Sequence, residues 1–257
     1  MWPSIRKKLM ESDTLGAYVE RLEESWALAV AMLEHAPSGL LVSAPGTGKT
    51  RLAGQGMGKA VHSVTLGTYA TRADLIGLPD LHKAGGFVPG PALLAMRDGA
   101  RLVVNEINRP ETDAVATFLQ LCDMADATAT GRPDCFFSLS NGERAFPASG
   151  FQVIGTSNAP LEALDPALAD RLQGATVILP GPHPDAYDAL GDAACMVAVK
   201  NHAACWDDPE RRVSMRSWLA YARYLNRGLD AQQAAKLAFG ARAEELLDAM
   251  TLAGEDR

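Results

Sequence analysis

The segment LLVSAPGTGKT, residues 40–50, decides the fold of the chain. Apolar residues 40–42 suit a buried strand, a glycine-rich turn follows, and Lys49 and Thr50 begin a helix. A strand, such a turn and a helix in this order are typical of a phosphate-binding loop, or P-loop. Glycines let backbone N–H groups approach phosphate oxygens, and the helix N-terminus adds a favourable dipole. We therefore predict a nucleotide site whose contacting residues are Pro45, Gly46, Thr47, Gly48, Lys49 and Thr50.

The last two residues of this loop have separate roles. Lys49 is expected to reach the β- and γ-phosphates, and Thr50 to offer its hydroxyl to Mg²⁺. One position departs from the pattern G-x-x-x-x-G-K-S/T, because Ser43 stands where the first glycine is usual. A small residue still fits there. ATP with Mg²⁺ is the expected ligand pair, and GTP remains an alternative to ATP.

The composition limits the classes of protein to which the chain can belong. Its 257 residues suffice for one large domain or for a domain with a smaller companion, and 47% are hydrophobic and 21% charged, as in soluble globular proteins. The formal net charge of −7 disfavours wholesale binding to duplex nucleic acid. The chain has no apolar run long enough to cross a bilayer, and its four cysteines form no C-x-x-C pair. We predict a cytoplasmic protein with free thiols and no membrane contact.

A second polar motif follows the buried segment at residues 101–104. In P-loop ATPases a neighbouring strand ends in Asp-Glu, where the Asp holds Mg²⁺ and the Glu orients or deprotonates the attacking water. Here the pair is Asn105 and Glu106. Asn105 keeps an acceptor oxygen but lacks the negative charge, so it is a weakened candidate for contact with the nucleotide and the metal. Glu106 keeps the role of base.

The remaining pattern predicts alternating strands and helices, followed by helices alone. Strands are expected at residues 40–43, 62–66, 101–104, 151–156 and 176–179, and helices at 15–35, 92–97 and 110–124. Residues 136–147 predict a β-hairpin with a type I′ turn at Asn141-Gly142. Residues 1–13 are expected to form a short arm. The proline-rich residues 180–184 predict a linker to a small helical domain.

The motifs together resemble the AAA+ ATPases, in particular the MoxR and dynein-related branch that includes CbbQ/NorQ-type activators and the nucleotide-binding subunit of the McrBC type. SAPGTGKT, VVNEINRP, GTSNAP, LDPALADRL and VSMRSWLAYAR carry the likeness, which covers roughly residues 38–225. It implies a three-layer αβα P-loop NTPase domain with a parallel five-stranded sheet of order 5-1-4-3-2. It also implies domains at 1–180 and 184–257, the second an α-helical lid. Pore-directed inserts are implied at about 68–97 and 130–150.

The resemblance also assigns site residues and partners. Asn158 would position the lytic water, Arg216 would reach the γ-phosphate from the lid, and Arg171 would reach the γ-phosphate of the adjacent subunit. Arg109 resembles an arginine that the branch uses near the subunit boundary. Since Arg171 would act in trans, the resemblance implies a homo-oligomeric ring, most simply a hexamer. The client would be a separate polypeptide, in this branch often one with a von Willebrand A domain.

Three functions agree with these residues. The first is an Mg²⁺-dependent, MoxR-like ATPase that remodels or activates a partner protein. The second is a nucleic-acid-linked motor, McrB-like or phage-encoded, which the acidic net charge disfavours. The third is a nucleotide-gated scaffold that hydrolyses ATP poorly because of Asn105. A small-molecule kinase is a weaker fourth alternative, because it would leave Asn158, Arg171 and Arg216 without a role.

Overall fold

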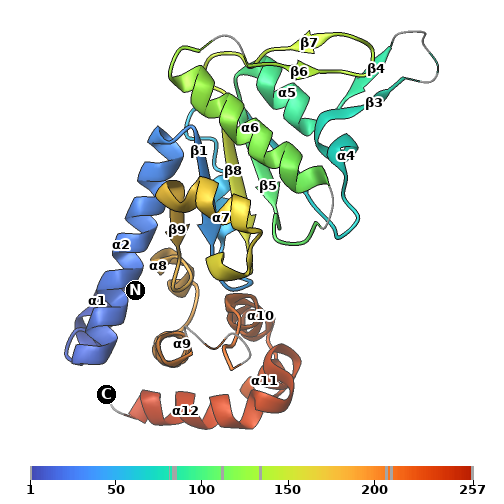
Figure 1. The fold of residues 1–257 in the computed structure, drawn as a ribbon. Helices are drawn as coiled ribbons and strands as arrows, with labels where there is room; N and C mark the ends of the chain where they lie inside the picture. The colour runs from blue at the N-terminus through green and yellow to red at the C-terminus, as the bar shows by residue number, and fades with distance from the viewer. Residues whose placement is uncertain are drawn as a thin grey trace. The chain divides into compact units, whose positions relative to one another are not determined.

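In the computed structural model, the five apolar segments form one parallel sheet (Figure 1). Its strands are β1 (Ser38–Val42), β2 (Val61–Thr65), β5 (Arg101–Asn105), β8 (Gln152–Ser157) and β9 (Thr176–Ile178). Their spatial order, β2-β5-β8-β1-β9, confirms the predicted order 5-1-4-3-2 read from the opposite edge. Each strand runs parallel to its neighbours, so the carboxyl ends of all five strands lie at one edge. The P-loop follows the carboxyl end of β1.

The structure describes residues 2–80, 82, 86–110, 113–132, 135–205, 208 and 211–255. The chain divides into two compact units. One unit comprises Leu28–Ser43 and Lys49–Ile178, and the other Met1–Ala27, Ala44–Gly48 and Leu179–Arg257. The second unit thus contains both the start of the chain and its C-terminal helices. The resemblance implied instead that residues 1–180 form one domain.

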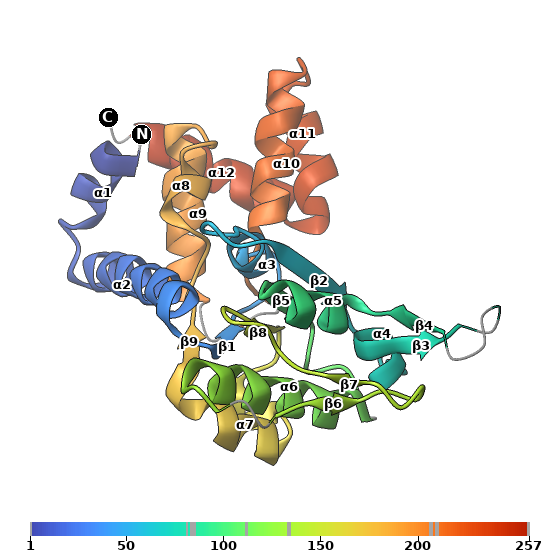
Figure 2. The same cartoon turned by 90° about the horizontal axis from the view of Figure 1, so that it is seen from above.

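Helices cover both faces of the sheet. They are α3 (Lys49–Ala53), α4 (Arg72–Ile76), α5 (Pro91–Asp98), α6 (Asp113–Ala129) and α7 (Pro166–Leu172), with short 3₁₀ turns at Leu161–Ala163 and Gln173–Ala175. Figure 2 shows α3 on one side of the sheet and α6 and α7 on the other. Alternate strand residues serve the two faces, and Leu40, Leu102 and Val153 join the cluster beneath α6. A Cβ on Gly155 would lie 2.9 Å from Cζ of Phe118, so this glycine lets α6 approach the sheet closely.

Two small antiparallel pairs project from this unit. The pair β3 (Gly77–Pro79) and β4 (Phe87–Pro89) belongs to the expected 68–97 insert, of which residues 81 and 83–85 lie outside the described part. The pair β6 (Phe137–Ser138) and β7 (Arg144–Ala145) confirms the predicted hairpin.

The predicted type I′ turn of that hairpin is wrong. Gly142 has a positive φ of 85°, but Asn141 is not among the described non-glycine residues with positive φ. Instead, Gly142 N donates to Leu139 O at 3.0 Å and Leu139 N to Glu143 O at 2.9 Å, which forms a longer loop with a bulge. The Asn141 side chain stabilises this loop by accepting from Glu143 N at 3.0 Å, and this role does not require a left-handed backbone at Asn141.

The second unit is helical. Its elements are α1 (Trp2–Leu9), the first part of α2 (Asp13–His35), α8 (Pro184–Tyr187), α9 (Asp192–Ala204), α10 (Met215–Asn226), α11 (Ala231–Phe239), a 3₁₀ turn (Gly240–Arg242) and α12 (Ala243–Glu255). Residues 1–13 were expected to be an arm, yet Trp2, Ile5 and Leu9 are buried on one face of helix α1. Trp2 stacks on Tyr187 with ring centroids 5.4 Å apart, which anchors α1. None of the described helices has the length and apolar character needed to span a membrane.

Candidate nucleotide-binding site

The P-loop has the backbone shape that its sequence predicts. Gly46 and Gly48 have φ values of +81° and +103°, which residues with a Cβ rarely adopt. Thr47 Oγ1 donates to Ala44 O at 3.1 Å, so the turn is stabilised from within. Ser43, which replaces the usual first glycine, is 5% exposed and is accommodated at the end of β1. The loop therefore accommodates its one departure from the motif.

Lys49 connects the P-loop to the end of the neighbouring strand β8. It is 6% exposed, and its Nζ donates to Ser43 O at 3.2 Å and to Asn158 Oδ1. Asn158 N in turn donates to Asn108 Oδ1 at 3.3 Å, after strand β5. Three strand ends are thus joined through side chains. A buried ammonium held by neutral oxygens is well placed to attract an anionic ligand.

The carboxyl end of β5 brings Asn105 and Glu106 to the same edge. Asn105 is 6% exposed; its Oδ1 accepts from Thr156 Oγ1 at 3.2 Å and its Nδ2 donates to Val64 O at 3.4 Å. The amide therefore bridges β2, β5 and β8. Glu106 has a left-handed backbone, with φ +61°, and its carboxylate forms an ion pair with Arg109. A non-glycine residue in this conformation is uncommon and often marks a functional position.

Arg216 belongs to the helical unit together with the tip of the P-loop. It lies in the first turn of α10, which begins at the N-cap Ser214. A Cβ on Gly46 would lie 3.4 Å from Ser214 Cβ and 3.7 Å from Arg216 Cγ. The predicted lid arginine thus starts next to the phosphate loop.

The structure does not bring Arg171 to this group through a described contact. Arg171, near the end of α7, forms ion pairs with Asp123 and with Asp126 of α6, the latter at 2.9 Å. Asp126 also accepts from Ser38 Oγ at 3.0 Å. Arg171 is therefore fixed within its own chain, with 38% of its side chain exposed.

Trp26 and His183 are candidate site residues that the sequence did not reveal. Trp26 Nε1 donates to Gly181 O at 3.1 Å, and its ring meets His183 edge-on with centroids 4.9 Å apart. A Cβ on Gly48 would lie 3.8 Å from Cη2 of Trp26. In the sequence, Trp26 belongs to an apolar helical stripe that is typical of ordinary core packing. Only its contact with the P-loop distinguishes it from a core residue.

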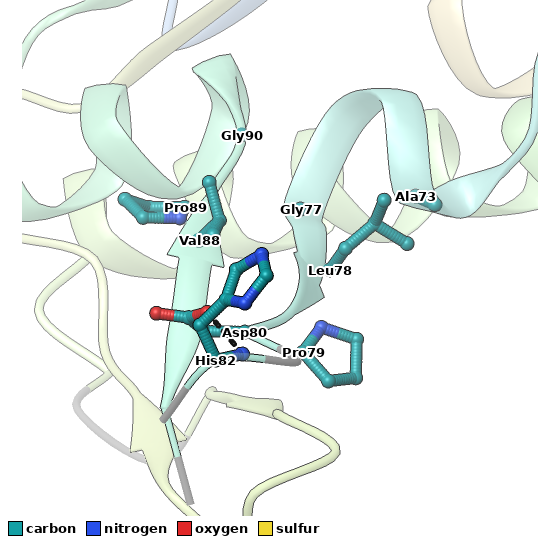
Figure 3. Close-up of a pocket in the computed structure, with 9 residues that line it drawn as sticks. All are labelled: Ala73, Gly77, Leu78, Pro79, Asp80, His82, Val88, Pro89 and Gly90. Atoms are coloured by element: carbon teal, nitrogen blue, oxygen red, sulfur yellow. Dashed lines mark hydrogen bonds between the residues drawn. The ribbon is translucent and has the colours of Figure 1, made fainter. Parts of the chain in front are cut away.

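A separate hollow lies on the β3–β4 insert (Figure 3). It has a volume of about 410 Å³ and is lined mainly by apolar groups, among them Leu78, Pro79 and Val88. Asp80 lies beside it and accepts from His82 N at 2.9 Å. This hollow holds none of the predicted site residues.

The residues present fit a nucleotide better than they fit a bound metal alone. The glycine backbone and buried Lys49 suit phosphate, and Thr50 is exposed at the head of α3. Among the described residues, no group of three or more His, Cys, Asp or Glu side chains could hold a metal ion. The Asn105 amide already has partners on two strands. Any magnesium would therefore depend on Thr50, on phosphate oxygens and on the second lone pair of Asn105 Oδ1.

Several solved structures match the chain at low identity. A mutant form of RuvB from Thermotoga maritima has a TM-score of 0.47 and 15% identity, with 91% of this chain and 69% of that chain covered. Cdc6p of Pyrobaculum aerophilum has a TM-score of 0.47 and 16% identity, with 89% and 69% covered. NtrX of Brucella abortus in complex with ATP has a TM-score of 0.45 and 16% identity, with 91% and 68% covered. No curated protein matches the sequence.

A match to a family model identifies the family of the chain. The model described as AAA domain (dynein-related subfamily) matches residues 38–172, which is more than half of the 257 residues. The matched part includes the P-loop, strand β5 with Glu106, and strand β8 with Asn158. The chain therefore belongs to the AAA domain family, dynein-related subfamily.

Proposed function

We propose that this chain binds ATP with Mg²⁺, hydrolyses it, and uses the energy in a homo-oligomeric ring to remodel or activate a separate partner protein. The observation that carries the proposal is the contact between Lys49 Nζ and Asn158 Oδ1, which joins the P-loop to the end of β8. This contact brings a phosphate-binding cation and a water-positioning amide to one edge of the sheet. Family membership supports nucleotide binding in general.

Each residue of the site has a distinct role in this proposal. Backbone N–H groups of residues 46–48 and the Lys49 ammonium would hold the phosphates, and the Thr50 hydroxyl would be a ligand of the metal. When bound, ATP would supply the phosphoryl group and Mg²⁺ would neutralise part of its negative charge. Glu106 accepts the proton of the attacking water, and Asn158 orients that water. Asn105 keeps a lone pair on Oδ1 that could serve the metal shell in place of a carboxylate.

Two arginines would neutralise charge that develops on the γ-phosphate. Arg216 would be one of them, and its side chain begins beside Gly46 of the P-loop. Arg171 would approach from the adjacent subunit after leaving Asp123 and Asp126. An arginine in such a role supplies roughly 10³ to 10⁵ in rate. Because the second arginine comes from another copy, one chain alone has an incomplete site, and a closed ring, most simply a hexamer, completes every site.

The partner would be a separate polypeptide, of the MoxR-client kind that carries a von Willebrand A domain. The β3–β4 and β6–β7 pairs are the segments that would transmit movement to it, since they project from the α/β unit (Figure 1). Cys122, Cys135, Cys195 and Cys205 are free thiols, in keeping with a cytoplasmic location.

A nucleotide-gated scaffold is the second candidate, and the hydrogen bonds of Asn105 favour it. Its amide is committed to Thr156 and Val64, so the site lacks a charged metal ligand at this position. Such a protein would assemble on ATP and turn it over slowly.

Steady-state ATP hydrolysis with Mg²⁺ tests the proposal, at protein concentrations that allow assembly. Wild type should turn over, and Lys49→Ala should lose the activity because the phosphates lose their cation. Asn105→Asp should bind Mg²⁺ more tightly but lose stability by about 1–3 kcal/mol, because its carboxylate would face Val64 O where the amide now donates. A silent wild type beside an active Asn105→Asp would establish the scaffold instead. Turnover by wild type that Lys49→Ala retains in full would contradict both.

A further inference from the structure

The hollow on the β3–β4 pair exposes two apolar side chains. Leu78 of β3 and Val88 of β4 stand opposite each other in the strand register, and 57% and 55% of these residues are exposed. Opposed residues of an antiparallel pair lie on the same face, so the two side chains form one apolar surface at the hollow (Figure 3). Its volume of about 410 Å³ lies in the range of about 300–1,000 Å³ that is typical of ligand sites. The hollow can therefore receive a bulky side chain.

Two glycines that line the hollow fix the backbone beside it. Gly77 has a φ of +111°, and a Cβ there would lie 2.1 Å from Val88 O. A Cβ on Gly90 would lie 2.5 Å from Leu75 O. Only glycine lets the chain approach itself this closely at both positions. The shape of the hollow therefore depends on a tightly packed backbone and not on exposed side chains alone.

An added β-strand does not fit the edge of β3. The hydrogen bonds at the two ends of the β3–β4 pair, of 2.9 and 2.8 Å, direct the N–H of Leu78 towards β4, because bonded positions alternate in an antiparallel ladder. Gly77 N donates to Ala73 O at the end of α4, and Pro79 has no N–H. In β3, all of whose residues the structure describes, no N–H is left for a new strand. A ligand on this side is therefore recognised through side chains.

One carboxylate determines the charge of the hollow. Asp80 is half-buried, and its Oδ1 accepts from His82 N at 2.9 Å, whereas no described contact engages its Oδ2. None of the described residues that line the hollow is a lysine or an arginine that could neutralise Asp80. The chain as a whole has a formal net charge of −7. These charges favour a ligand that places a cation beside an apolar group.

We propose that this hollow is a docking site for an extended segment of a partner polypeptide, in which a bulky apolar side chain stands next to a lysine or an arginine. The apolar side chain would pack on Leu78 and Val88, and the cation would pair with Asp80 Oδ2. The inference rests on the proposed function for the existence of a separate partner, and it names the chemistry that the partner presents. The hollow shares no residue with the P-loop, so docking does not require a nucleotide.

Methyl NMR of the full chain, with ¹³C labels on the leucine and valine methyl groups, tests the inference. The probe is the capped peptide acetyl-Gly-Leu-Lys-Gly-amide, and acetyl-Gly-Leu-Gln-Gly-amide is its neutral counterpart. The signals of Leu78 and Val88 should shift and saturate with the lysine peptide. Because partly exposed ion pairs have modest strength, the lysine peptide should bind about two- to five-fold more tightly than the glutamine peptide.

Substitutions separate the charge from the apolar surface. Asp80→Asn should weaken the lysine peptide about two- to five-fold and abolish its advantage, because the amide still accepts from His82 N but has no charge. Val88→Thr keeps the branched shape but replaces a methyl group by a hydroxyl, so it should weaken both peptides about two- to four-fold. Asp248→Asn, which neutralises an exposed aspartate of α12, is the matched control and should change neither Kd.

The outcomes separate this inference from the proposed function. If the two peptides bind wild type equally, or if Asp80→Asn keeps the preference for lysine, the inference is wrong. Signals of Leu78 and Val88 that shift with protein concentration, and with neither peptide, would place a second copy in the hollow and also overturn it. Lys49→Ala should bind the lysine peptide as wild type does, so a failed nucleotide site leaves the inference intact. Wild type that hydrolyses ATP but binds neither peptide would contradict the inference alone.

Discussion

Arg101 is the largest charged side chain that the α/β unit buries completely, with 1% of the residue exposed. It begins β5 and donates to neutral oxygens only in its described hydrogen bonds. The acceptors are Gln152 Oε1 at 2.6 Å, Leu33 O and Gln55 O at 2.7 Å each, and Ala53 O at 3.2 Å. Leu33 and Ala53 lie near the C-terminal ends of α2 and α3, where helix carbonyls carry partial negative charge. Burial lowers the pKa of this guanidinium, and the carbonyls offset part of that cost.

Replacement of Arg101 should therefore be severely destabilising. In Arg101→Met the buried carbonyls of Leu33 and Ala53 would lose this donor, at a cost of about 3–5 kcal/mol. Urea unfolding followed by circular dichroism measures the change, with exposed Arg132→Met as the control. A loss below about 1 kcal/mol would show that the carbonyls find other donors.

At the residue scale, motif spacing could predict which residues gather at the carboxyl edge of the sheet but not which hydrogen bonds hold them there. The P-loop fixes Lys49 and the strand ends fix Asn105, Glu106 and Asn158, because parallel strands end at one edge. The hydrogen bonds of Asn105 depend on the side chain of Thr156 and the backbone of β2. These partners are distant in sequence, so no local sequence pattern predicts them.

At the scale of elements, the sequence predicted all five strands of the sheet with ends within two residues of those observed. Each strand is a short apolar run bounded by glycine, proline or polar residues, which is the strongest local signal for a buried parallel strand. Helix α1 was missed because three basic residues obscure the apolar spacing of Trp2, Ile5 and Leu9. The turn of the β6–β7 hairpin was misjudged because Asn141 uses its side chain rather than its backbone.

His202 ties three elements of the helical unit together. Tyr187 of α8 contacts its Nδ1 at 2.7 Å, and its Nε2 lies 2.7 Å from Val213 O, just before α10. A carbonyl only accepts, so Nε2 carries the proton and Nδ1 accepts from the tyrosine hydroxyl. Burial, and then the nearby Arg212 charge, lower the pKa of His202 to about 3.

The stability of this protein should consequently fall in acid. His202 is neutral when folded but protonates near pH 6.5 when unfolded, so its contribution is complete above pH 6.5 and is lost as the pH falls towards 3. The slope from this residue is about 1.4 kcal/mol per pH unit in that window. Unfolding measured between pH 7 and pH 5 should show it, and His202→Gln should flatten the dependence. Exposed His35→Gln should keep the wild-type slope, and an equal slope in His202→Gln would contradict the assignment.

At the scale of the whole molecule, the proposed function would require more than one chain to complete the site. Lys49, Glu106 and Asn158 belong to the α/β unit. Arg171 instead pairs with Asp123 and Asp126 on the α6 helix of its own chain. In the proposed ring it would exchange these carboxylates for the γ-phosphate of the adjacent subunit. Assembly and hydrolysis would then be coupled, because each copy completes the site of its neighbour.

The measurement that tests this most directly is ATP hydrolysis by an equal mixture of Lys49→Ala and Arg171→Ala chains, beside each variant alone. Each variant alone should be inactive. In random rings about one quarter of the sites would combine an intact Lys49 with an Arg171 from the neighbour, so the mixture should recover about a quarter of the wild-type rate. A mixture as inactive as its components, or an Arg171→Ala chain as active as wild type, would contradict the shared site.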